Sequence, residues 1–326
     1  MNPAPTSGNH TLEGVRVVLL RGADQAVRTA GELHSRGAAV QLLPLIDFET
    51  PDDSELFDAA LKGLASGAFS WLVVTSSTTV RALKQQLARR GLGLSSAVPS
   101  GTRIAAVGEA TAGALFAEGL RADLVPDRTG HESSAAGLAA AFRGLTPEGR
   151  ILLPQADIAA DTLERLLVGQ GWDLVQVTAY RTVAYPADPS RRITASVGAS
   201  RAVRDDETGA SGRGASGSRP ELPELDPAGF WAAVTAGAID AVVFTSPSTV
   251  RRLSEQTPFS PIEGFPAGLA AVMIGASTAA EARRCGIPIA AVAADPTPAG
   301  IADAIAAAMQ EHTDREKLKA REEEHP

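Results

Sequence analysis

The chain has 326 residues, of which 44% are hydrophobic and 4% aromatic, enough for about two domains with sizeable cores. Its formal net charge of −8 argues against a nucleic-acid partner, which would favour a basic chain. A single cysteine, Cys285, excludes an intrachain disulfide and fits the cytoplasm. No signal peptide is evident, and no apolar run approaches the ~20 residues that span a membrane.

The first element is an apolar, β-branched run, Val15–Leu20, which predicts a buried strand. A short loop beginning at Arg21 leads into a helix that ends at Gly37. The next apolar run, Ala39–Leu43, predicts a second strand and completes a β-α-β unit.

Further strands are predicted along the chain, each followed by a helix or a short loop. They are Trp71–Val74, Ile104–Val107, Ala122–Val125, Ile151–Leu153, Leu174–Val177 running on to Tyr180, Ala241–Phe244, Ala270–Ile274 and Ile289–Val292. Alternating strands and helices predict an α/β fold of parallel sheets with helices on both faces.

Two segments depart from this pattern. The stretch from about 188 to 226 is rich in Gly, Ser and charge and has few large apolar residues, so we expect a disordered insert. The charged tail, residues 311–326, is expected to be a frayed helix end at the surface.

The chain contains an internal echo. The segment Val73–Leu83 (VVTSSTTVRAL) is matched by Val243–Leu253 (VFTSPSTVRRL), and each is followed by a second pair, Val107–Thr111 (VGEAT) with Ile274–Thr278 (IGAST). A third pair reverses the order: LLRGAD at Leu19–Asp24 precedes its partners, whereas LLPQAD at Leu152–Asp157 follows them.

Only two distant copies occur, so the echo predicts two similar domains rather than a solenoid. The reversed order of the third pair is explained most simply if one domain is discontinuous. We therefore expect domain 1 to comprise residues 1–46 and 184–326 and domain 2 to comprise residues 47–183.

Each echo places a Ser, Thr or Gly turn between a strand and a helix. Such turns collect hydroxyls and free backbone N–H groups at the carboxyl edge of a parallel sheet, where helix N-termini favour anions. The candidate binding residues are Thr75, Ser76, Thr111, Ser246 and Thr278, with Arg21 and Arg181 as local cations and Arg81 and Arg251 as further basic residues nearby. Because the net charge is negative, an anionic ligand would depend on these local donors.

Several mechanisms lose ground. The chain has no Gly-x-Gly-x-x-Gly fingerprint after Leu20, no phosphate-binding Walker loop and no Gly-x-Ser-x-Gly elbow. Its five histidines are scattered without the spacing of a metal site. Nucleotide-dependent, metal-dependent and covalent-serine mechanisms are therefore disfavoured.

The motifs resemble those of the uroporphyrinogen-III synthase family from about Val15 to Ala308, apart from the insert. The resemblance is carried by the two Thr-Ser turns, the two Gly-x-x-Thr turns and Val177–Thr182 (VTAYRT). It implies two flavodoxin- or Rossmann-like domains joined by a two-stranded connection, with the site in the cleft.

The resemblance also implies a function: cyclisation of hydroxymethylbilane to uroporphyrinogen III, with loss of water and inversion of ring D, without a cofactor. Tyr180 matches the tyrosine that the family uses in catalysis, and the hydroxyl residues match positions that line the site. We expect a cytoplasmic monomer without membrane or nucleic-acid partners. The alternative is a two-domain small-anion sensor without catalysis, which would bind and release its ligand unchanged.

Overall fold

The computed structural model describes residues 11–126, 135–194, 196, 222–256, 265–266 and 268–323, with side chains of the last helix described to Thr313. Contacts divide them into two compact units. Unit 1 contains residues 11–47, 184–186 and 222 onward, and unit 2 contains residues 48–183 and 187–196.

Unit 1 is built on a five-stranded sheet of order β10-β9-β8-β1-β2, in which every pair is parallel. Its strands are β1 (Arg16–Leu19), β2 (Ala39–Leu42), β8 (Ala241–Phe244), β9 (Ala270–Met273) and β10 (Ala291–Val292). Its helices are α1 (Ala23–Ser35), α8 (Pro227–Thr235), α9 (Pro247–Glu255), α10 (Ala276–Arg284) and α11 (Pro298–Glu323).

Unit 2 carries the second sheet, of order β3-β7-β6-β4-β5. Its strands are β3 (Ile46–Glu49), which crosses the unit boundary, β4 (Trp71–Val74), β5 (Arg103–Ala106), β6 (Arg150–Ala156) and β7 (Asp173–Ala184). Its helices are α2 (Glu55–Ala65), α3 (Ser77–Ala88), α4 (Leu94–Ala97), α5 (Glu109–Ala117), α6 (Ala135–Phe142) and α7 (Thr162–Val168).

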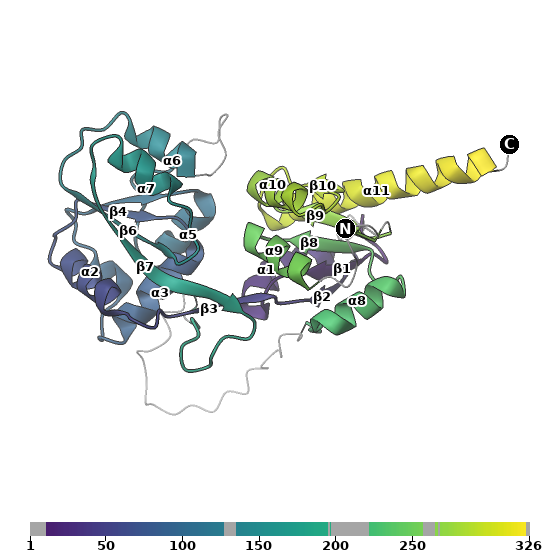
Figure 1. Cartoon of the computed structure of the whole chain (residues 1–326), viewed down its shortest axis with the longest axis horizontal. Coiled ribbons are helices and arrows are strands. Elements are labelled where there is room, and N and C mark those ends of the chain that lie inside the picture. Colours follow the sequence, from purple (N-terminus) through teal and green to yellow (C-terminus); the bar gives the residue numbers. More distant parts are fainter. Residues whose placement is uncertain are drawn as a thin grey trace, which may run out of the picture. The chain divides into compact units, whose positions relative to one another are not determined.

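Both sheets are covered by helices on two faces (Figure 1). Along β1, Val17 and Leu19 enter one apolar cluster while Val18 enters the other. Along β4, Leu72 enters the apolar cluster on one face of the sheet and Val73 enters the cluster on the other. Alternate side chains of a strand point to opposite faces, so strands buried on both sides must be apolar throughout. This explains the short apolar runs and confirms the predicted α/β fold class.

The internal echo corresponds to a shared topology. The two Thr-Ser turns follow β4 and β8, the Gly turns follow β5 and β9, and the Leu-Leu pairs lie within β6 and at the end of β1. In each sheet the Thr-Ser strand lies between the other two, in the orders β5-β4-β6 and β9-β8-β1. The echoed motifs therefore occupy equivalent places in two similar sheets.

Two expectations need correction in unit 2 and at the crossover. The strand expected at 122–125 is a single bridge between Leu124 and Ala105. The strand β3 was not predicted, because its sequence IDFE alternates apolar with charged residues. It neighbours β7 in the sheet, and the backbone pairing extends to a 3.2 Å bond from Tyr185 N–H to the carbonyl oxygen of Leu45.

The expected disordered insert is also shorter than predicted. Residues 191–193 pair with β3, through Thr50 N to Arg191 O at 2.9 Å and Ile193 N to Phe48 O at 2.8 Å. Ile193 is 1% exposed in the core of unit 2, so this segment packs there rather than with the discontinuous unit to which the sequence assigned it. Burial of the Ile193 side chain offsets the entropy cost of ordering this segment. The Gly/Ser-rich composition had suggested that this cost would keep the segment disordered.

The other end of the insert is ordered as well. Leu42 N donates to Pro223 O and Leu225 N donates to Leu42 O, both at 2.8 Å, so residues 223–225 extend the edge beyond β2. Residues 195 and 197–221 lie outside the described part. At the carboxyl end, α11 continues through the charged tail to Glu323 instead of fraying at Glu311.

Candidate functional site

In unit 2 the carboxyl ends of β4 and β5 bring two helix N-termini to one sheet edge. Ser76 is the N-cap of α3, with an extended backbone (φ −155°, ψ 156°) and a side-chain oxygen that accepts the Thr79 N–H at 3.0 Å. Thr111 lies in the first turn of α5 behind Gly108 and is 4% exposed. Thr75 is partly buried beside Ser76.

Tyr180 reaches this edge from another strand. It lies on β7, which is separated from β4 by β6, and its hydroxyl oxygen is 3.1 Å from Ser76 Oγ. The rings of Tyr180 and Phe48 pack edge to face, with their centroids 5.4 Å apart. Tyr180 is 7% exposed. The structure thus brings together Tyr180 and Ser76, two predicted site residues 104 positions apart.

Burial raises the pKa of the Tyr180 phenol above its ordinary value, because the charged phenolate would lose hydration. Hydrogen bonds from Ser76 and Thr79 act in the opposite direction, and the negative charge of Asp157 adds to the increase. The phenol therefore keeps its proton at neutral pH and can serve as a donor.

In unit 1 the ends of β8 and β9 repeat the arrangement. Ser246 is the N-cap of α9 and forms a capping box with Thr249: its Oγ accepts Thr249 N–H at 3.3 Å while its own N–H donates to Thr249 Oγ1 at 3.2 Å. Thr278 lies in the first turn of α10 and is 1% exposed. The hydroxyl of Thr245 donates to Leu20 O at 3.0 Å, which ties this turn to the end of β1.

Arg21 follows directly after Leu20 at this edge. Among the described residues its guanidinium makes no hydrogen bond or ion pair. Burial lowers the pKa of Arg21, although the nearby charge of Asp24 raises it. An arginine nevertheless stays cationic at neutral pH, so Arg21 is a charged donor to which the described part of the chain offers no bonded counterion.

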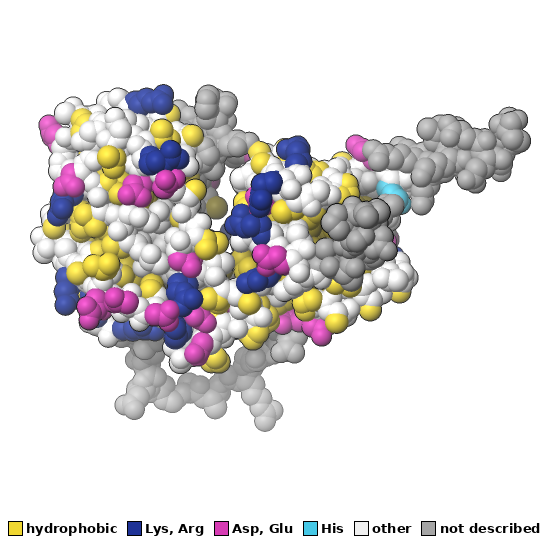
Figure 2. All heavy atoms as spheres, in the orientation of Figure 1, with side chains coloured by type: hydrophobic (Ala, Val, Ile, Leu, Met, Phe, Trp, Pro, Cys, Tyr) yellow, Lys and Arg dark blue, Asp and Glu magenta, His cyan; other side chains and the backbone are white. Residues whose placement is uncertain are grey.

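The other candidate cations are engaged. Arg181 pairs with Asp52, which also pairs with Arg191. Arg81 donates to Ile193 O at 3.0 Å, and Arg251 pairs with Glu281 at 3.1 Å. On the face drawn in Figure 2, described basic and acidic side chains are interspersed rather than gathered in one basic field. An anion would therefore be met locally.

Two residues near the unit 2 edge were not predicted. Thr79 was recognised only as part of the echo, although its hydroxyl lies 3.0 Å from Ser76 Oγ. Gln155, within the LLPQAD motif, is 3% exposed, and its buried Nε2 has no hydrogen-bond partner among the residues that the structure describes. The echo could have identified Thr79 through its match with Thr249, whereas nothing in the local sequence identifies Gln155.

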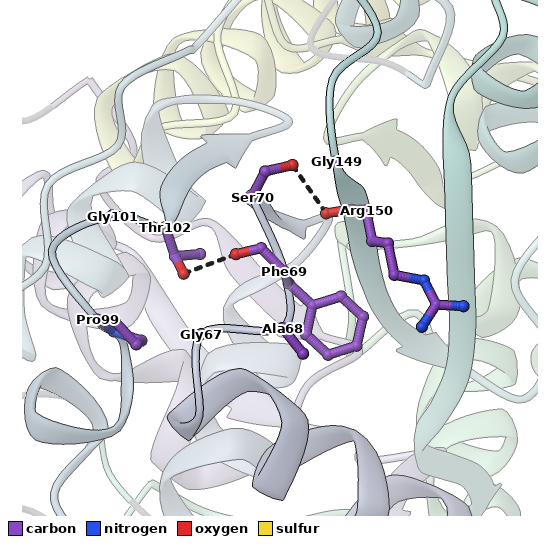
Figure 3. Close-up of a pocket in the computed structure, with 9 residues that line it drawn as sticks. All are labelled: Gly67, Ala68, Phe69, Ser70, Pro99, Gly101, Thr102, Gly149 and Arg150. Carbon is purple, nitrogen blue, oxygen red and sulfur yellow. Dashed lines mark hydrogen bonds between the residues drawn. The ribbon is translucent and has the colours of Figure 1, made fainter.

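A hollow of about 340 Å³ lies at the opposite, amino-terminal edge of the same sheet (Figure 3). Its polar groups already have partners: Ser70 Oγ donates to Arg150 O at 3.0 Å, and Thr102 Oγ1 donates to Phe69 O at 2.9 Å. Arg150 pairs with Asp173. Gly149 has φ +73° and a Cβ there would lie 2.7 Å from Ser70 Oγ, so this glycine serves close packing. The hollow offers no unsatisfied donors of the kind found at the carboxyl edges.

The described residues also bear on metal-binding and membrane-spanning classes of protein. They contain no group of three or more His, Cys, Asp or Glu side chains that could hold a metal ion. None of the helices formed by these residues has the length and apolarity required to cross a bilayer.

Comparisons with known proteins agree with the resemblance. A family described as "Uroporphyrinogen-III synthase HemD" matches residues 27–303. A uroporphyrinogen-III synthase of Synechococcus elongatus is 31% identical over 172 residues, which is 52% of this chain and 62% of that relative. The match thus spans less than two thirds of the relative's length.

Solved structures support the fold. A mutant uroporphyrinogen III synthase of the extremely thermophilic bacterium Thermus thermophilus has a TM-score of 0.54 at 19% identity, covering 91% of this chain and 100% of the other. A synthetase of Helicobacter pylori has a TM-score of 0.48 at 16% identity over 89% of this chain and 97% of the other, a score too low to add support. Since the family match covers most of the sequence, this chain belongs to the uroporphyrinogen-III synthase family.

Proposed function

We propose that this chain is a uroporphyrinogen-III synthase, a hydro-lyase that converts hydroxymethylbilane to uroporphyrinogen III. The observation that carries the proposal is the buried, protonated phenol of Tyr180, held against the N-cap of α3 at the edge where the family's motifs gather. The matching family and the Synechococcus elongatus relative are both named as uroporphyrinogen-III synthases, which leaves the alternative of a non-catalytic sensor without support.

In the proposed reaction, Tyr180 donates its proton to the terminal hydroxymethyl group of the substrate. The C–O bond breaks, water leaves and an azafulvenium cation remains. The substituted carbon of ring D attacks this cation to form a spiro intermediate, which fragments and recloses with ring D inverted. A proton lost on closure returns to the Tyr180 phenolate, so the enzyme and the proton count are restored.

The acidic side chains of the substrate need several anion donors. We propose that Arg21 binds one carboxylate in unit 1, because no described residue supplies its guanidinium with a bonded counterion. Thr75, Ser76 and Thr111 in unit 2, and Ser246 and Thr278 in unit 1, would contribute hydroxyls and helix N-termini. Arg181 could contribute only by exchanging Asp52 for the substrate.

Positioning is the main task of such an enzyme, because hydroxymethylbilane also cyclises unaided to the uninverted isomer. The protein must favour attack by the substituted carbon over the easier closure. Neither a cofactor nor a metal is required by this scheme. The cytoplasmic location and monomeric state expected above complete the proposal.

An isomer assay tests the function. Purified, metal-free protein without added cofactor is expected to yield mainly the type III product, separated from type I by chromatography after oxidation to the porphyrins. Type I product at the uncatalysed rate would refute the proposal. Size-exclusion chromatography of the same sample tests the monomeric state.

Replacing the phenol tests the role of Tyr180. Tyr180→Phe is expected to reduce kcat by about 10²-fold or more, the usual contribution of a general acid. Its effect on thermal stability should be small, because the ring and its packing on Phe48 are retained. An unchanged kcat would exclude Tyr180 as the proton donor.

A further inference from the structure

The hydroxyl of Ser76 lies at a junction of three polar groups. Its Oγ accepts the Thr79 N–H at 3.0 Å, lies 3.0 Å from Thr79 Oγ1 and lies 3.1 Å from the Tyr180 hydroxyl oxygen. A serine hydroxyl has one proton and two lone pairs. The Thr79 N–H uses one lone pair, so the direction of the remaining bonds depends on where the single Ser76 proton points.

We propose that Ser76 is a positioning residue that donates its proton to the Tyr180 oxygen, which leaves the phenol proton free for the departing hydroxyl of the substrate. This inference rests on the proposed function and assigns Ser76 a role beyond binding. After Tyr180 has given up its proton, the same Ser76 O–H would stabilise the phenolate.

The surroundings of Tyr180 make such a partner necessary. The apolar ring of Phe48 packs against the Tyr180 ring from β3 in a T-shaped pair, and Asp157 brings a negative charge from the loop after β6. The backbone N–H of Asp157 donates to the backbone carbonyl oxygen of Tyr180 at 3.0 Å, and the Asp157 carboxylate accepts the Thr182 N–H at 2.9 Å. These two bonds hold Asp157 in place. A phenolate formed here is opposed by burial and by Asp157.

Ser76 and Thr79 oppose both effects. Their hydrogen bonds lower the pKa of Tyr180. Ser76 is the N-cap of α3 and Thr79 lies in its first turn, so the twelve-residue helix directs the positive end of its dipole toward this point. A hydroxyl held by its own helix needs little reorganisation when the charge develops, which is the condition for efficient electrostatic stabilisation.

The echoed turn in unit 1 provides a matched control. Ser246 caps α9 as Ser76 caps α3, but its Oγ lies 2.9 Å from Ser248 Oγ, and Thr249 donates its hydroxyl to Ser246 O at 2.8 Å. Replacing either serine by alanine removes one N-cap and should lower the melting temperature by a similar few degrees. Only the Ser76 change removes a partner of Tyr180.

The experiment uses the full-length protein in a Tyr185→Phe background, which leaves Tyr180 as the single tyrosine because the chain has only two. Tyrosinate absorbance is titrated against pH, with circular dichroism on the same samples so that only folded protein is compared. Ser76→Ala is expected to move the Tyr180 titration to higher pH, whereas Ser246→Ala leaves it in place.

Turnover adds a second, independent measurement. Ser76→Ala should lower kcat by about 10- to 100-fold, the loss expected for one hydrogen bond to a charged group, with a smaller change in KM. Ser246→Ala should act mainly on KM, and Ser76→Thr should restore most of kcat. Equal titrations and equal kcat losses for the two alanine variants would overturn the inference.

The two proposals can fail separately. If the parent protein forms no type III product, the proposed function is wrong, and the titration still shows whether Ser76 acts on Tyr180. If the parent forms type III product but Ser76→Ala titrates and turns over like the parent, the role of Ser76 is wrong while the function stands.

Discussion

Arg21 offers the sharpest test of anion binding, because its substitution should separate binding from stability. Part of its side chain reaches solvent, yet burial is strong enough to lower the pKa of the guanidinium, and the described residues supply no hydrogen bond or ion pair to it. Burying such a charge costs desolvation free energy in the ligand-free protein, and an ion pair with a bound anion offsets that cost. Arg21→Met keeps the length and apolar stem of the side chain but removes the charge.

The expected magnitudes follow from this position. A hydrogen bond to a charged group contributes about 1.5–3 kcal/mol, so KM for hydroxymethylbilane should rise about 10- to 150-fold. Loss of an unpaired, partly buried charge should stabilise the protein by about 1 kcal/mol, or about 2–4 °C in melting temperature for a domain of this size.

The assay combines initial rates with thermal melting in the absence and presence of uroporphyrin III, a stable polycarboxylate. The parent protein should melt at a higher temperature with this ligand, and Arg21→Met should lose most of that shift. Arg28→Met is the control, since Arg28 is exposed on α1 of the same unit. A variant that melts lower than the parent and keeps its KM would show that Arg21 is structural and refute the reasoning.

Two further predictions concern stability. Burial pushes the pKa of Asp240 upward, but hydrogen bonds from the Arg16 side chain and backbone, at 2.6–2.9 Å, lower it more. The pair therefore stabilises the fold at pH values above the unfolded pKa of about 4, and this stabilisation is lost as the pH falls through the lowered pKa of the folded state. In Asp240→Asn, the free energy of unfolding measured with urea should therefore fall less steeply at acid pH than in the parent. Parallel pH dependences of the two proteins would contradict this. Ile193→Ala should cost about 2–5 kcal/mol, because Ile193 is buried in unit 2, whereas deleting Thr208–Ser218 should leave melting and activity nearly unchanged. Equal effects of these two changes would remove the distinction between the packed end of the insert and its Gly/Ser-rich part.

Much of the fold could be predicted because its signals are local. Strands buried on both faces, such as Trp71–Val74 and Ala241–Phe244, must be apolar at every position, and both were predicted with the bounds observed. Helix caps depend on neighbours only three residues away, so Ser76 and Ser246 were recognised as turn residues from the sequence.

Contacts between distant residues decided the rest. The strand β3 was missed because its buried Asp47 and Glu49 contradict the apolar pattern, and the insert was overextended because the burial of Ile193 depends on its pairing with Phe48. At the edges of the sheets, the pattern of residue types could not show that Asp52 pairs with Arg181.

The same division holds for the proposed site. The sequence alone identifies two similar sheets and the hydroxyl-bearing turns at their edges, because helix capping and strand burial depend on residues that are neighbours in the sequence. Folding alone decides that Tyr180 reaches Ser76 across β6 and that Arg21 finds no bonded counterion among the described residues. These features depend on contacts between residues that are distant in the sequence. Such contacts form only when the strands have assembled into a sheet, so local sequence patterns cannot predict them.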